Sequence, residues 1–285
     1  MRPQVPNVLP PDQYRSNNQI MIGSDIPRIT PILLTGNKQT HDWPRILLVH
    51  GTMDRATSFK RAAKHLSGYE VISYDRRGYA TSPFQDINGM PKKVSWQIHL
   101  RDLTEIVNEK PTVVFGHSYG GTLTLLAAER RVENLLGLVA FESPLSWIPG
   151  WSTWSTNSAD PSEAIDLEWA KKQAKGFMIS MIGEDSWRRL PPSTKRSREI
   201  EGITMLSEMS SMSHLSPVLD PSQIKVPVII ARSEQAPERH VKGSDYLANT
   251  IPDSQIRIVS NTDHGVHLKR PEKVAELVRE IIARL

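Results

Sequence analysis

The chain has 285 residues, which is enough for one large domain or two modest ones with a substantial buried core. Its formal net charge of +4 is small for this length, and no basic stripe is interleaved with aromatic residues, which argues against a nucleic-acid binder. The absence of cysteine excludes disulfide bonds, thiolate metal sites and a cysteine nucleophile.

The N-terminal residues 1–18 are polar and proline-rich, which is typical of an extended arm or a disordered tail. They contain no apolar core of a secretory signal, and no run in the chain approaches the ~20 apolar residues that span a bilayer. We therefore expect a cytoplasmic protein with no membrane partner. The sequence leaves the oligomeric state open.

Short apolar runs alternate with amphipathic stretches over the first half of the chain. Residues 45–49 form a continuous apolar run, which indicates a strand buried on both faces of a parallel sheet. The same criteria predict further strands at 19–22, 28–35 and 69–74, and helices at 56–66 and 94–109.

A Gly-x-Ser-x-Gly box runs from Gly116 to Gly120, directly after an apolar strand that begins at residue 112. A helix-compatible pattern begins inside the box, and this order of strand, sharp turn and helix is the context in which the motif marks a nucleophile, Ser118. The turn needs glycine because a Cβ would collide with the adjoining strand or helix. The backbone N–H of Tyr119 then lies at a helix N-terminus, where it is expected to stabilise a developing oxyanion.

The second half begins with a strand at 135–141 that ends at Glu142, after which the alternation of strands and helices stops. Residues 147–221 are predicted to be helical and irregular, and the basic run from Lys195 to Arg198 is typical of a solvated face. Strands at 226–231 and 255–259, a helix at 245–250 and a C-terminal helix at 271–285 follow.

These motifs resemble the α/β-hydrolase superfamily: the serine box, His50-Gly51 after one strand, Asp75-Arg76-Arg77-Gly78 after the next, and His264 near the end. The resemblance covers residues 29–285 and implies an α/β-hydrolase fold, with a mostly parallel central sheet, flanking helices and a helical cap insertion. The expected organisation is an N-terminal arm at 1–18, a core at 19–144 and 223–285, and a cap at 145–222.

The resemblance also implies most of the site. The loop after His50-Gly51 supplies the second oxyanion donor in the family, usually a backbone N–H that here belongs to Thr52, with Met53 as the alternative. His264 stands at the position of the catalytic base, and His267 in the same loop is the rival. Asp75 and Arg76 are expected to stabilise loops and to take no part in catalysis.

The catalytic acid departs from the common pattern. The family usually carries an aspartate after the strand at 226–231, but Ala236 stands where that carboxylate would be. Some members instead carry the acid after the strand that follows the nucleophile helix, which here is the position of Glu142. An apolar strand delivers Glu142 to the carboxyl edge of the sheet, so Glu142 is the predicted acid, with Glu234 and Glu238 as alternatives.

The predicted reaction is hydrolysis of a carboxylic ester or lactone through a covalent intermediate on Ser118, with no metal or organic cofactor. The predicted substrate is a small apolar molecule, because tryptophan and methionine side chains of the cap are expected to roof the site. Two alternatives remain open: cleavage of a carbon–carbon bond in a β-diketone-like compound, and a non-catalytic ligand-binding protein that has kept the fold.

Overall fold

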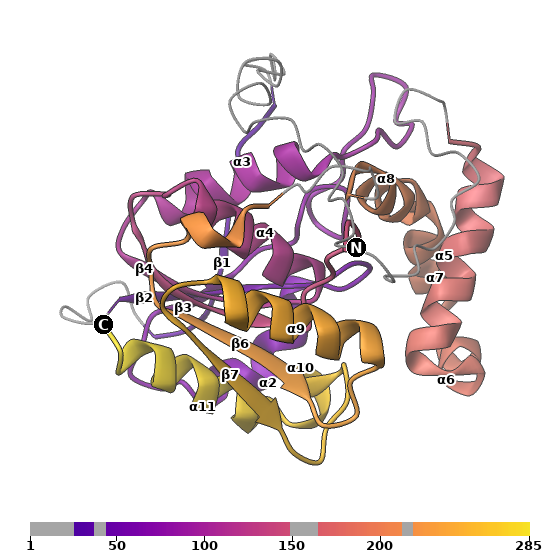
Figure 1. Ribbon diagram of the computed structural model, residues 1–285. Coiled ribbons are helices and arrows are strands. Elements are labelled where there is room, and N and C mark those ends of the chain that lie inside the picture. Colours follow the sequence, from indigo (N-terminus) through magenta and orange to yellow (C-terminus); the bar gives the residue numbers. More distant parts are fainter. Residues whose placement is uncertain (1–25, 37–43, 149–164, 213–218) are drawn as a thin grey trace, which may run out of the picture.

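The computed structural model describes residues 26–36, 44–148, 165–212 and 219–285. The predicted arm at 1–18 and the predicted strand at 19–22 lie outside these residues. Within them, seven strands form one sheet in the order β1-β3-β2-β4-β5-β6-β7 (Figure 1). β1 is antiparallel to β3 and the other neighbours are parallel. The strands are β1 (Ile32–Thr35), β2 (Arg45–Val49), β3 (Val71–Ser73), β4 (Thr112–His117), β5 (Leu135–Phe141), β6 (Val228–Ser233) and β7 (Ser254–Val259).

The central strands are continuous apolar runs because both faces of the sheet are covered. Side chains alternate between the faces of a strand, so Val114 packs into one core while Val113 and Phe115 pack into the other. Helices α3 (Trp96–Val107), α4 (Tyr119–Glu129) and α9 (Glu238–Thr250) contribute to the first core. The second core is closed by η1 (Ala56–Phe59), α2 (Lys60–Lys64), α10 (Val266–Lys269) and α11 (Pro271–Ile282). The short η2 (Pro221–Gln223) leads back into the sheet.

Among the described residues, the four α-helices α5 to α8 lie between β5 and β6 in the chain and to one side of the sheet in space (Figure 1). We call residues 165–212 the helical insertion; its helices are α5 (Leu167–Ile182), α6 (Glu184–Arg189), α7 (Pro192–Ile200) and α8 (Gly202–Met212). Met178, Trp187 and Met205 are buried in a cluster that also contains Met53 and Tyr79 of the sheet's loops. These apolar side chains therefore attach the insertion to the body of the protein.

The parallel strands end at the same edge of the sheet, and each predicted site residue lies just beyond such an end. β6 continues to Ser233, two residues past the predicted end, because Ser233 still pairs with Val259 of β7. In the described part of the chain, no helix is both long and apolar enough to span a bilayer.

Candidate active site

Ser118 lies at a strained turn between β4 and α4, as its motif predicts. Its φ of 52° and ψ of −124° are unfavourable for a residue with a side chain, and such strain is concentrated at functional sites. A Cβ on Gly116 would lie 2.6 Å from the backbone oxygen of Gly120, and one on Gly120 would lie 2.5 Å from that of Val49. The two glycines are thus required by close backbone contact, and the turn presents the serine at the edge of the sheet.

The loop after β2 lies directly against this serine. A Cβ on Gly51 would be 3.0 Å from Cβ of Ser118, so this loop passes directly beside the side chain of Ser118. Within the described residues, the backbone N–H groups of Thr52, Met53 and Tyr119 make no hydrogen bond. Free donors on two sides of a serine are the arrangement that an oxyanion requires.

Glu142 and His264 are in direct contact although they are far apart in the sequence. Nδ1–H of His264 donates to Oε2 of Glu142 across 2.5 Å, which leaves Nε2 of the imidazole as the basic nitrogen. The other carboxylate oxygen accepts the backbone N–H of Ser233 at 2.8 Å and also its hydroxyl. Burial alone would raise the pKa of Glu142, but the hydrogen bonds from His264 and Ser233 lower it to about 2.

The loop that carries His264 is held beside Ser118 by His117. Nε2–H of His117 donates to the backbone oxygen of His264 at 2.7 Å, and the two ring centroids are 4.7 Å apart. No hydrogen bond joins the Ser118 hydroxyl to the His264 ring in the described part of the chain. Such contacts are commonly long in ligand-free hydrolases and tighten when substrate binds.

The rival residues have other partners. Glu234 accepts the backbone N–H of Asn261 at 3.0 Å, and the exposed Glu238 pairs with Lys242 on its own helix at 2.7 Å. His267 is buried, with Nε2 3.0 Å from Oδ2 of Asp54. Of the two candidate histidines, His264 is therefore the one that contacts Glu142.

The loops around the serine are fixed by Asp75 and Arg76, in agreement with the sequence interpretation. Asp75 accepts the backbone N–H of Ala56 at 2.8 Å and the hydroxyl of Thr81 at 2.7 Å. Arg76 donates to the backbone oxygens of His50 at 2.9 Å and Gly51 at 3.0 Å.

The sequence patterns do not predict the positions of several residues in this region. His240 of α9 is buried and its ring stacks on His264, with centroids 5.5 Å apart. The expectation that Arg198 lies on a solvated face is wrong: its side chain reaches the backbone oxygen of Met53 at 2.5 Å. Glu208 of α8 is fully buried against Arg76. A charged residue inside the apolar run of α8 is itself a signal, because a buried carboxylate needs a partner.

Two groups of side chains have the chemistry of metal ligands. Histidine nitrogens and carboxylate oxygens within 4.8 Å of one another occur in the groups Asp54, His117, His267 and Glu142, His240, His264. In the second group the imidazole of His264 is already held by Glu142. A metal ion there would compete with the contact that orients this imidazole.

Comparison with known proteins agrees with the fold. Residues 46–277 match the model of the alpha/beta hydrolase family. Monoacylglycerol lipase ABHD6 of Rattus norvegicus is 36% identical over 264 residues, covering 84% of this chain and 75% of the relative. The sn-1-specific diacylglycerol lipase ABHD11 of Mus musculus is 23% identical over 281 residues, covering 92% of this chain and 89% of that protein.

Solved structures show the same architecture. A thermophilic esterase from Thermogutta terrifontis superposes with a TM-score of 0.64 at 19% identity, covering 90% of this chain and 93% of the esterase. The enol-lactonase from Burkholderia xenovorans LB400 superposes with a TM-score of 0.65 at 16% identity, covering 90% of this chain and 96% of the lactonase. With a seven-stranded, mostly parallel sheet, a serine elbow and lipase-like relatives, the chain belongs to the alpha/beta hydrolase family.

Proposed function

We propose that the protein is a serine hydrolase that cleaves a carboxylic ester or lactone of an apolar small molecule through an acyl-enzyme on Ser118. One observation carries the proposal. Ser118 is strained and lies beside backbone N–H groups that make no hydrogen bond in the described part of the chain. Glu142 holds the ring of His264, and the backbone of His264 is bound to His117, the residue before the serine. These are the parts of a nucleophile, an oxyanion hole and an oriented base.

In the acylation step, Nε2 of His264 takes the proton from the Ser118 hydroxyl as its oxygen attacks the substrate carbonyl. The N–H groups of Thr52 and Tyr119 donate to the oxygen that becomes negative. The tetrahedral intermediate then collapses, the bond to the alcohol oxygen breaks, and His264 returns the proton to the leaving alkoxide. In a lactone the new alcohol stays attached to the acyl group.

In the deacylation step, His264 takes a proton from water, and the resulting hydroxide equivalent attacks the acyl carbonyl. The same two N–H groups hold the second oxyanion, and its collapse releases the acid and returns the proton to Ser118. Glu142 keeps Nδ1 protonated and stabilises the imidazolium in both steps. Its pKa, lowered to about 2, keeps it ionised at neutral pH.

The substrate class is supported by the relatives and by the chain's own composition. The names of the rat and mouse relatives describe lipases that act on monoacylglycerols and diacylglycerols, which are carboxylic esters with apolar acyl chains. The helical insertion contributes methionine and tryptophan side chains next to the loop after β2, and methionine accepts varied apolar shapes. Its place beside this loop suits a cap over the site.

The test uses p-nitrophenyl esters from acetate to laurate, a monoacylglycerol and a lactone, together with labelling by a fluorophosphonate. We expect turnover that favours medium or long acyl chains, and we expect Ser118→Ala to abolish both turnover and labelling. Ser67→Ala, at an exposed serine, is the matched control and should retain both. A wild-type protein that neither hydrolyses any of these compounds nor accepts the label would overturn the proposal.

A further inference from the structure

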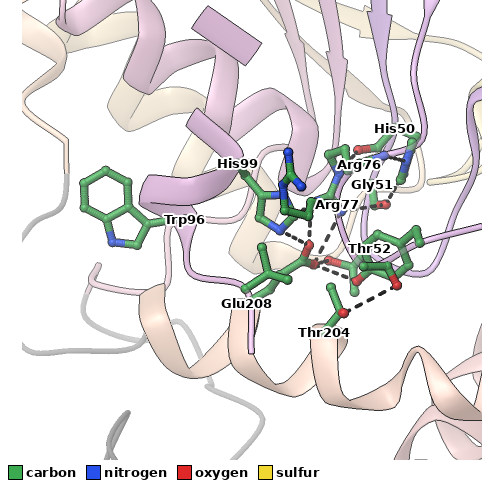
Figure 2. A network of polar contacts seen from close by, with 12 residues as sticks. His50, Gly51, Thr52, Arg76, Arg77, Trp96, His99, Thr204 and Glu208 are labelled. Atoms are coloured by element: carbon green, nitrogen blue, oxygen red, sulfur yellow. Dashed lines mark hydrogen bonds and ion pairs between the residues drawn. The ribbon is translucent and has the colours of Figure 1, made fainter. Parts of the chain in front are cut away.

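A buried ion pair lies beside the loop after β2 that contains Gly51 and Thr52, which we call the oxyanion loop (Figure 2). The side chains of Arg76 and Glu208 are both 0% exposed, and Nη1 of the arginine bonds to Oε1 of the glutamate. Arg76 follows β3, whereas Glu208 comes from α8 of the helical insertion. Enclosing two charges is costly, and a buried ion pair is weak evidence for a role in stability alone.

Glu208 collects hydrogen bonds from three further side chains. Nε2–H of His99 donates to Oε1 at 2.8 Å, while the hydroxyls of Thr52 and Tyr79 each donate to Oε2 at 2.9 Å. Burial would raise the pKa of Glu208, but Arg76 and His99 lower it to about 2. The carboxylate therefore stays charged and holds the side chain of Thr52 directly.

Arg76 holds the same loop by its backbone. Its Nη2 donates to the backbone oxygen of Gly51 at 3.0 Å, and Nδ1 of His50 lies 2.7 Å from that oxygen. The C=O of Gly51 and the N–H of Thr52 belong to one planar trans peptide, so they point in opposite directions. Fixing the carbonyl toward Arg76 thus fixes the direction of the Thr52 N–H on the other side.

The guanidinium also contacts the residue that carries the second donor. Its carbon lies 4.8 Å from the ring centroid of Tyr119, directly after the nucleophile. One buried cation therefore contacts the Gly51 carbonyl and the side chain of Tyr119, and its counter-charge comes from the insertion. If α8 moved away, Arg76 would lose its carboxylate partner and Thr52 would lose the acceptor of its hydroxyl.

We infer that Arg76 and Glu208 are positioning residues for the oxyanion hole, so that the Thr52 N–H is correctly aimed only when helix α8 is docked on the body of the protein. This inference rests on the proposed serine hydrolase activity. It assigns to the insertion a role in assembling the catalytic site, in addition to any contact with substrate.

The test compares two variants of this network with one of a separate contact. Glu208→Gln removes the charge at nearly constant shape, and Thr52→Val removes the hydroxyl while keeping the backbone N–H and the ion pair. Glu201→Gln is the control, because Glu201 also joins the insertion to the body, through Arg55 at 2.8 Å and the backbone N–H of Ala80 at 2.9 Å. It makes no contact with the Gly51–Thr52 peptide.

The readouts are kcat and KM on the best ester, and the inhibition constant of a trifluoromethyl ketone that forms an oxyanion when Ser118 adds to it. We expect kcat to fall about 10- to 100-fold in Glu208→Gln and about three- to tenfold in Thr52→Val, with KM within threefold of wild type. The inhibition constant should rise in proportion to the loss of kcat/KM, because both depend on the same oxyanion donors. Glu201→Gln should lower thermal stability without changing kcat.

Thr52→Val keeps the inference testable if Glu208→Gln does not fold. A wild-type enzyme that hydrolyses esters normally, with Thr52→Val and any folded Glu208→Gln within twofold of its kcat and inhibition constant, would overturn the positioning role alone. A wild-type protein that neither hydrolyses esters nor is labelled at Ser118 would overturn the proposed function, and the positioning role with it.

Discussion

The sheet fixes the position and orientation of a single residue, Glu142. It follows β5 directly, has a φ of 45° and is fully enclosed, so its carboxylate has little freedom. Its backbone N–H donates to the backbone oxygen of Ala231 in the neighbouring strand β6 at 2.9 Å. In the same strand, the backbone N–H of Ser233 donates to one oxygen of the Glu142 carboxylate. Two strands therefore hold this carboxylate, and its remaining oxygen is available to orient His264.

Replacing this acid by its amide tests the assignment at the residue scale. In Glu142→Gln the imidazole loses both its orientation and the charge that stabilises imidazolium, so we expect kcat to fall by about 10²- to 10⁴-fold. Steady-state kinetics on the best ester measure the change. Glu234→Gln is the control and should stay near wild type, because Glu234 bonds to the Asn261 backbone instead. Nearly full activity in Glu142→Gln would show that the acid has been misplaced.

At the scale of elements, the crossing of α5 and α8 decides where Glu208 lies. A Cβ on Gly202 would be 2.2 Å from the backbone oxygen of Ala170, so the first turn of α8 packs directly on α5. Gly176 of α5, by contrast, has no neighbouring atom within 4 Å of the place that a Cβ would occupy, and it keeps an ordinary helical φ. One glycine is required by contact and the other is not.

Alanine at these two positions should have opposite effects on stability. Gly176→Ala is expected to stabilise the protein by about 0.5 to 1 kcal/mol, because alanine favours the helix. Gly202→Ala forces the two helices apart, so it should lower both the melting temperature and, through Glu208, the activity. Thermal denaturation and ester hydrolysis of both variants provide the measurements. Equal melting temperatures for the two variants would refute the close packing of α8 on α5.

At the scale of the whole molecule, the interior holds many ionisable groups in one protonation state. Burial, with Arg76 nearby, lowers the pKa of His50 to about 3, and burial beside His264 lowers that of His240 to about 3. Burial also lowers the pKa values of His99 and His117. These histidines are neutral in the folded protein at a pH at which the unfolded chain would bind protons.

Lowering the pH should therefore destabilise the fold already at pH values well above the range in which carboxylates titrate. A histidine with a lowered folded pKa contributes its full stability above the unfolded value of 6.5 and loses it as the pH falls toward the folded value. Each such group lowers the free energy of unfolding by about 1.4 kcal/mol per pH unit in that window. The lowered pKa values of Glu142 and Glu208 add a second loss below 4.5.

Urea denaturation at pH 7, 6 and 5 tests this expectation. The free energy of unfolding should fall at each step. His50→Gln should reduce the slope of this free energy against pH by up to the contribution of about one proton, because the pKa of His50 is lowered in the folded protein. A free energy that is constant or rises from pH 7 to pH 5 would be incompatible with neutral buried histidines.

Local sequence patterns predict the fold and the elbow because their physical causes are local. Continuous apolar runs mark strands that are covered on both faces, and the glycines around Ser118 mark a turn that allows no Cβ. The order of strands and loops then brings His264 and Glu142 to one edge. The exact ends of elements are less predictable, because pairing such as that of Ser233 with Val259 extends β6.

The network beside the oxyanion loop could not be predicted in this way. Arg76, Thr52 and Glu208 come from three separate segments, and the position of α8 relative to the loop depends on the packing of the whole insertion. Arg198 likewise lies in a run that looks solvated, yet it reaches Met53 across the interface. Contacts between an insertion and a loop produce no periodic pattern of residues in the sequence, so they cannot be predicted from it.

The most direct test of the central claim is the mass of the enzyme trapped during turnover. The protein is mixed with an activated ester, quenched in acid within seconds and digested, and its peptides are analysed by mass spectrometry. We predict that the acyl mass appears on the peptide that contains Ser118, is absent in Ser118→Ala, and decays more slowly in Glu142→Gln than in wild type. Ester hydrolysis that persists in Ser118→Ala, or an acyl group on another residue that forms and decays as fast as turnover, would contradict the account.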